Sequence, residues 1–231
     1  MKNLCFTLIF FLSATLALRA QDVCESGYLA FRQGVSIELT NYDKKGKISG
    51  IQRQKVNSVE AFADGFKAGV SVVVSNEKGK SLSEGNYHIE CKDGVLYMDM
   101  SNMLDPRAME GFKNMEMEMS GNALAFPTQL IPGQTLPDGT INIKAMTSGI
   151  ALMNLSLNIT NRKVEAAEVV TTPAGTFECI RISQDTEMKS FMKMKFKTIS
   201  WFAIGVGLVK SENLDDKGKV ESSTVLTKFE K

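Results

Sequence analysis

Methionines are the residues of this chain whose spacing most directly suggests chemistry. In the stretch FKNMEMEMSG, Met115, Met117 and Met119 recur at every second position. Three thioether sulfurs suit a soft metal ion such as Cu(I). However, same-face residues of a strand are about 6.5–7 Å apart, so three sulfurs of one strand converge only if long side chains bend inward. The alternation is also typical of a half-buried strand, and we favour that interpretation over a copper site.

A second run, FMKMKFK, has the same alternation with lysines in place of glutamates. The two runs mirror each other, which predicts that they lie in one sheet and leaves open whether they are adjacent. Facing Glu–Lys pairs would then contribute about 0.2–1 kcal/mol each. Methionine is flexible and polarizable, and it suits the wall of an apolar cavity. The residues that we expect in the core or facing a ligand are Met115, Met117, Met119, Met192, Met194, Phe196 and Trp201.

The residue types that support common catalytic and metal sites are scarce. The single histidine, His88, lies in an expected strand, and a Ser–His–Asp triad would have to use it. Zinc sites built on several histidines or on Cys-x-x-Cys pairs are excluded by count. The 26 acidic residues always offer carboxylate pairs, but no feature selects one. We therefore predict no catalytic residue, no cofactor and no resident metal.

The first twenty residues have the pattern of a secretory signal. Lys2 precedes an apolar run over residues 4–18, and Ala20 is a small residue at the expected cleavage point. The run is shorter than the roughly 20 residues that a membrane-spanning helix needs. We predict a signal peptide over residues 1–20 and export, most simply to the periplasm. The mature chain contains no second run long enough to span a membrane.

The charge of the mature chain is nearly balanced. Losing Lys2 and Arg19 from the 27 basic residues leaves 25 against 26 acidic ones. Because basic and acidic residues are nearly equal in number, the charge suggests neither nucleic acid nor an anionic membrane surface as a partner.

Three cysteines follow the signal, and an oxidising compartment allows one pair. We prefer Cys24 with Cys91, because Cys24 sits on a loose N-terminal segment that gains most from being tied down. Cys179 would then remain a buried thiol. The sequence alone does not fix this connectivity. Cys179 as a nucleophile is the alternative, but no Cys–His arrangement surrounds it.

Turn signals predict an antiparallel sheet. DKKGK (43–47), NEKGK (76–80) and DDKGK (215–219) each place an Asp or Asn before Lys-Gly-Lys, as in a tight hairpin. Another hairpin is expected around Lys-Asp-Gly within residues 86–100. Short helices are expected at 105–113, where Asp105 can cap, and less strongly at 58–66. The predicted fold is mainly β: one domain over 21–231, built on a long curved, mostly antiparallel sheet as an open or half barrel, with one or two short helices.

Two segments resemble a known family. TTPAGTFECIRIS (171–183) and SWFAIGVGLVKSE (200–212), with YDKKGK and YMDM elsewhere, are similar to the TapB-like group of exported bacterial proteins of unknown function. Ile204 departs from that pattern, where a proline is expected after the aromatic pair. The resemblance implies an extracytoplasmic, β-rich fold similar in outline to the open barrels of lipoprotein carriers. It implies no activity, catalytic residue or cofactor.

These observations favour a non-catalytic exported protein that binds a hydrophobic ligand, or a lipidated partner, on the inner face of a curved sheet. The first alternative is an interaction or scaffold protein of the cell envelope without a small-molecule cavity. A hydrolase using a carboxylate pair in a polar cleft, or a Cu(I)-binding protein, is less favoured.

Overall fold

The fold is a single antiparallel sheet. The computed structural model describes residues 24, 27–29, 32–98, 115–122, 124–190 and 192–231. Its strands, in chain order, are β1 (Ser36–Asp43), β2 (Ile48–Phe62), β3 (Gly65–Ser75), β4 (Ser81–Lys92), β5 (Val95–Met98), β6 (Glu116–Asn122), β7 (Leu124–Pro127), β8 (Gly139–Thr147), β9 (Ile150–Thr172), β10 (Gly175–Lys189), β11 (Lys193–Ala203), β12 (Gly207–Leu214) and β13 (Val220–Glu230).

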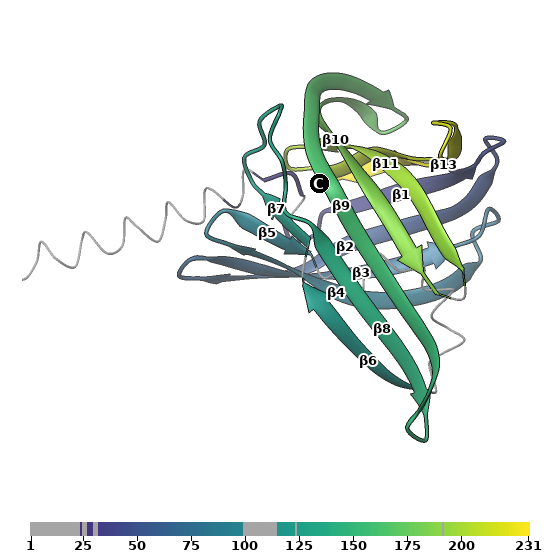
Figure 1. Cartoon of the computed structure of the whole chain (residues 1–231). Coiled ribbons are helices and arrows are strands. Elements are labelled where there is room, and N and C mark those ends of the chain that lie inside the picture. The colour runs from purple at the N-terminus through teal and green to yellow at the C-terminus, as the bar shows by residue number, and fades with distance from the viewer. Residues whose placement is uncertain (1–23, 25–26, 30–31, 99–114, 123, 191) are drawn as a thin grey trace, which may run out of the picture.

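The sheet curves into a nearly closed barrel (Figure 1). Its strand order is β6-β8-β9-β10-β11-β12-β13-β1-β2-β3-β4-β5-β7. The two edge strands, β6 and β7, follow each other directly in the chain, so one short stretch passes from one edge of the sheet to the other. The mainly β architecture with a long curved antiparallel sheet is therefore confirmed.

Neither expected helix is found among the described residues. The candidate over 105–113 lies outside the described residues. The candidate over 58–66 is wrong, because β2 continues to Phe62 and β3 starts at Gly65. A β-carbon on Gly65 would come 1.8 Å from the carbonyl oxygen of Cys91, so glycine lets β3 and β4 approach there. This pairing overrides the local helical pattern. No helix in the described part of the chain is long and apolar enough to cross a membrane.

The three repeated turns have one structure, and the hairpin prediction is confirmed. In each turn the side-chain oxygen of the first residue accepts hydrogen bonds from the backbone N–H groups two and four positions later, at 2.8–3.0 Å. The glycine of each turn has a φ of 74–79°, which a side chain would strain. The first residues are Asp43, Asn76 and Asp215, and the glycines are Gly46, Gly79 and Gly218.

Alternation along the strands places apolar side chains inside. In β8, Ile141, Ile143 and Ala145 are buried, whereas Asn142 and Lys144 between them are exposed. The buried residues form three clusters. One lies around the two half-cystines, one lies between β8 and β9, and one joins β11–β13 and β1 with the far end of the β9–β10 hairpin. That hairpin is the longest of the fold and bends over one end of the barrel (Figure 1).

A disulfide ties the N-terminal segment to the sheet. Cys24 and Cys91 are joined in the structure, with their Cα atoms 6.0 Å apart, and both are fully buried. This is the pair that we preferred from the sequence. Cys179 is free and buried on β10.

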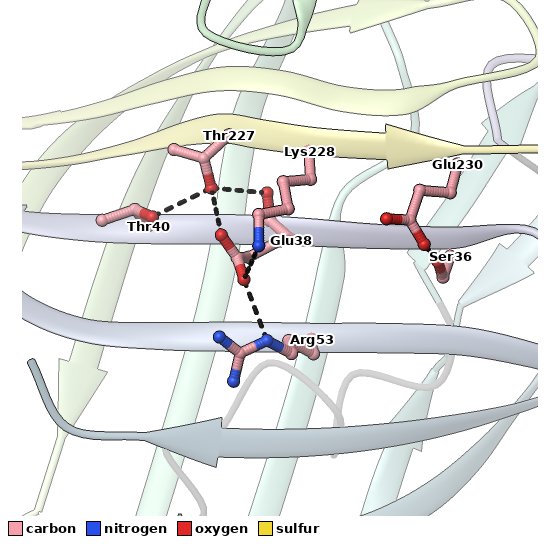
Figure 2. Close-up of polar contacts among 7 residues, drawn as sticks. All are labelled: Ser36, Glu38, Thr40, Arg53, Thr227, Lys228 and Glu230. Carbon is pink, nitrogen blue, oxygen red and sulfur yellow. Dashed lines mark hydrogen bonds and ion pairs between the residues drawn. The ribbon is translucent and has the colours of Figure 1, made fainter. Parts of the chain in front are cut away.

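A polar cluster joins the first strand to the last (Figure 2). Arg53 of β2 donates to the Glu38 carboxylate at 2.9 Å, Thr227 of β13 donates to it at 3.0 Å, and Lys228 lies 3.5 Å away. Burial acts to raise the pKa of Glu38, but the hydrogen bonds and cationic charges around it lower the pKa overall. Because the carboxylate is fully partnered, its role is to hold β1 between β2 and β13.

The two methionine runs lie in one sheet, as expected, but they are not neighbours. β8, β9 and β10 separate β6 from β11. Direct pairing between their glutamates and lysines, which the sequence had left open, therefore does not occur. Glu118 instead lies 3.9 Å from Lys144 on β8. Lys193 and Lys195 lie 3.0 and 3.2 Å from Glu187 on β10.

The cations around Glu187 predict a pH dependence. Hydrogen bonds from Lys189 and Lys193 lower the pKa of Glu187 from 4.5 to about 2. A lowered pKa stabilises the folded state above the unfolded value, and this stabilisation is lost as pH falls towards 2. The free energy of unfolding should therefore be higher in the wild type than in Glu187→Gln at neutral pH. The difference should shrink between pH 4.5 and about 2 in urea titrations. A difference that stays constant over this range would contradict the assignment.

Candidate ligand-binding cavity

The barrel encloses a cavity of about 660 Å³. It is lined from β1–β5, β7 and β9–β13, and therefore from most of the circumference of the barrel. Its volume falls within the range of about 300–1,000 Å³ that is usual for small-molecule sites. The cavity follows from the fold, because a curved sheet of this many strands leaves more space than its inward side chains fill.

One part of the wall is apolar. Val56, Val70 and Ile89 come from β2, β3 and β4, while Phe126 and Ile182 come from β7 and β10. All five are buried members of the core cluster around the disulfide. The Phe126 ring lies 4.9 Å from the ring of Phe202, centroid to centroid, and both rings line the cavity. This region can bury the apolar part of a ligand.

Another part of the wall carries hydroxyl and amide groups that bond to one another. Ser200 and Ser211 are 3.0 Å apart, and Thr198 donates to the Asn213 side-chain oxygen at 2.9 Å. Since these bonds run between neighbouring strands, they satisfy the inward polar groups without a ligand.

Tyr87 adds a similar satisfied pair to the wall. Its hydroxyl donates to the Gln54 side-chain oxygen at 2.8 Å, and burial raises the pKa of Tyr87 to about 12. The phenol therefore stays neutral and contributes a polar but uncharged patch.

Arg162 reaches the cavity because of a β-bulge in β9. The register against β10 shifts at Gln184, and Asn161 and Arg162 both lie opposite this one residue. Asn161 has a left-handed backbone, with a φ of 52°. The extra residue reverses the alternation, so Arg162 is buried although Ile159, three positions earlier, is buried too. The bulge thus aims a cation at the interior.

The Arg162 side chain is fully buried, with an exposed fraction of 0%. Its Nη1 donates to the backbone carbonyl oxygens of Ala125 at 2.8 Å and of Pro137 at 2.6 Å. The guanidinium carbon lies 5.7 Å from the centroid of the Phe126 ring. Nε and Nη2 have no hydrogen-bond partner among the described residues. Sequence reasoning missed this residue.

Of the residues selected from the sequence, the structure places some at the cavity, some in the core and some on the surface. Phe196 lines the cavity. Trp201 is buried away from it, where its Nε1 donates to Glu168 and its ring lies 4.8 Å from the Lys210 ammonium. Met192 and Met194 are not core residues, because 74% and 45% of their surfaces are exposed near the β10–β11 turn.

Met115 is the one methionine of the MEMEM run whose side chain the structure describes. Met115 packs against the cluster between β8 and β9. The side chains of Met117 and Met119 lie outside the described part of the structure. Two methionines that we had not selected, Met98 and Met188, line the cavity. They were not selected from the sequence because neither lies in the MEMEM or MKMKFK run.

Few of the described residues have the features of catalytic or metal-binding groups. No carboxylate is among those that line the cavity, and the carboxylates with clearly shifted pKa values all have lowered ones. Burial raises the pKa of the Cys179 thiol to about 11, aided by the charge of Glu168. His88 is exposed on β4. Within the described ranges, no group of three His, Cys, Asp or Glu side chains could hold a metal ion.

Two solved structures share the fold. One, from Bacteroides fragilis, is described as a candidate exported protein with a YmcC-like fold; it is 22% identical, with a TM-score of 0.75 over 89% of this chain and all of that one. The other, from Parabacteroides distasonis, is described as a candidate lipoprotein; it is 21% identical, with a TM-score of 0.75 over 89% of this chain and 99% of that one. At this identity they support the fold alone.

Sequence comparison identifies the family. No curated protein matches the chain significantly. A model described as DUF3108-like matches residues 32–226, which include every strand from β1 to β12 and most of β13. The protein with this barrel and cavity therefore belongs to the DUF3108-like family.

Proposed function

We propose that this protein is a non-catalytic exported binding protein that takes a hydrophobic ligand, or the acyl chain of a lipidated partner, into the barrel. The observation that carries the proposal is the cavity of about 660 Å³ with its apolar wall. Burial of apolar ligand surface contributes about 25 cal/mol per Å². The inward polar groups near Ser200 and Tyr87 are already bonded, so an apolar chain beside them leaves no new unpaired group.

The compartment is part of the proposal. A signal peptide cleaved near Ala20 would deliver one folded unit, residues 21–231, to the periplasm. A disulfide between Cys24 and Cys91 suits that oxidising compartment. The descriptions of the two fold relatives as exported protein and lipoprotein agree with export. The narrower similarity to the TapB-like group, and the outline shared with lipoprotein carriers, point in the same direction.

Filling the cavity tests the proposal. The purified protein should bind a polarity-sensitive apolar dye and should release apolar material on extraction, detected by mass spectrometry. Ser200→Trp places an indole among the cavity-lining residues of β11, where it occupies space that the dye needs. Dye binding should weaken by about tenfold or more, which corresponds to a loss of about 1.4 kcal/mol in binding free energy. Lys197→Trp is the matched control, because Lys197 is an exposed residue of the same strand and does not line this cavity.

Two outcomes would contradict the proposal. One is a folded wild type that binds no dye and carries no apolar material. The other is equal dye binding by the wild type and a folded Ser200→Trp variant, with folding checked by circular dichroism.

A further inference from the structure

The guanidinium of Arg162 is a buried cation whose hydrogen bonding is incomplete. Nη1 has two carbonyl partners, but the single N–H of Nε and the two of Nη2 have none among the described residues. Buried donors are almost always paired, because an unpaired one keeps its full desolvation penalty, which is larger when the donor is charged. Arg162 is among the residues that line the cavity, and because Nε and Nη2 are themselves buried, an acceptor reaches them when neighbouring side chains shift. The unpaired donors therefore indicate that Arg162 binds an acceptor from outside the described chain.

The identity of the free atoms narrows the chemistry of that acceptor. Nε–H and one N–H of Nη2 lie side by side along one edge of the planar guanidinium. Two parallel donors of this kind match the two oxygens of a carboxylate or a phosphate. Nη1, on the other side, is held by the carbonyl oxygens of Ala125 and Pro137, which fixes the plane of the group. The fork is thus oriented before a ligand arrives.

The charges around the cavity favour an anion. Among the described residues that line it, the charged ones are Arg162 and Lys55, both basic. Burial lowers the pKa of Arg162 to about 10, and the charge of Asp138 acts in the opposite direction. The group therefore remains protonated at neutral pH. No ion pair of Arg162 with a carboxylate lies within the part of the chain that the structure describes.

A purely structural role explains the hydrogen bonds of Nη1 but not the unpaired donors on Nε and Nη2. Arg162 connects β9 to the edge strand β7 and to the segment before β8. Nη1 alone makes these bonds. A neutral amide could bond to the same carbonyl oxygens at a smaller desolvation cost.

We propose that Arg162 is the head-group site of the cavity, and that the ligand is an amphiphile with a two-oxygen anionic head, carboxylate or phosphate. The head accepts hydrogen bonds from Nε and Nη2, while the apolar chain lies along Phe126 and Ile182. This assignment rests on the proposed function and adds the class of ligand to it.

Three probes with one chain length separate the two proposals. Decanoate, decyl phosphate and decanol are titrated into the purified wild type by calorimetry. At least one anion should bind about tenfold or more tighter than decanol, because two charged oxygens accept from both donors and a single hydroxyl cannot. The tighter anion identifies the head group. In ¹⁵N-labelled wild type, that anion should shift a buried arginine Nε–H signal that decanol leaves unchanged.

Two variants test the role of the fork. Arg162→Lys keeps the charge and a donor for the carbonyl oxygens but loses the paired donors, so the preference for the anion should fall to about threefold or less. Arg181→Met is the matched control. It removes an arginine of the neighbouring strand β10 that pairs with Glu168 and does not line the cavity, and it should keep the preference.

The other possible results show which of the two proposals is wrong. If the folded wild type binds none of the three probes, both proposals fail. If decanol binds as tightly as both anions, the cavity binds apolar ligands and the assignment of Arg162 is wrong. The assignment is also wrong if a folded Arg162→Lys variant keeps the full preference. If that variant does not fold, the wild-type preference and the Nε–H shift decide.

Discussion

Replacing Cys24 and Cys91 together by serine is expected to lower the free energy of unfolding by about 4 kcal/mol. The disulfide closes a loop of 67 residues, and a cross-link of that length removes much conformational freedom from the unfolded chain. Both sulfurs are fully buried in the main core cluster, so two hydroxyl groups would also replace apolar contacts. Urea denaturation under non-reducing conditions measures the change.

The third cysteine supplies the control. Cys179→Ala removes a buried thiol that makes no disulfide, and it should cost only about 1 kcal/mol, the typical effect of a point substitution. Adding a reductant should destabilise the wild type but not the double serine variant. A loss below about 1 kcal/mol in the double variant would show that the disulfide does not stabilise the fold.

Features that depend on a few neighbouring residues were predictable from the sequence. The three Asp/Asn-x-Lys-Gly-Lys turns are fixed by a side chain that bonds to its own backbone and by a glycine with positive φ. Both causes lie within five residues. The hairpin around Asp93 and Gly94 was predictable for the same reason, and β4 and β5 pair there as expected.

Strand partners and burial were harder to predict, because alternation identifies a face but not its neighbour. MEMEM and MKMKFK have complementary charges, yet three strands separate them. The sequence pattern places Met192 and Met194 on one face with Phe196. Only Phe196 lies far enough from the β10–β11 turn to line the cavity. The first two lie near the turn at the end of the strand and are exposed.

Arg162 was missed although the sequence carries a signal for it. Met153, Leu157 and Ile159 occupy odd positions and are buried, but Val164 occupies an even position and is buried as well. Such a change of phase inside one strand requires an extra residue, and therefore a bulge. Asn161 is a residue type that tolerates left-handed backbone, which places the bulge next to Arg162. What the sequence could not show is that the arginine finds two carbonyl oxygens and no carboxylate.

Replacing Phe126 by alanine is expected to lower the free energy of unfolding by about 3–5 kcal/mol, as for other buried aromatic residues. Phe126 is 7% exposed, packs against Phe202 and lies beneath the Arg162 guanidinium. Since its ring lines the cavity, the space that it leaves would join the cavity, and neighbouring side chains could not fill it completely. The variant should therefore accept bulkier apolar ligands than the wild type while being less stable.

Phe62→Ala is the matched control for this loss. Phe62 is 38% exposed near the end of β2, so the same deletion of a ring there should cost about 1 kcal/mol or less. Urea titrations of the two variants measure the free energies of unfolding, and dye binding reports the size of the site. Equal losses in the two variants would show that the Phe126 ring is not part of the core. A full loss of stability without any change in ligand range would instead place the ring in the core but outside the binding site.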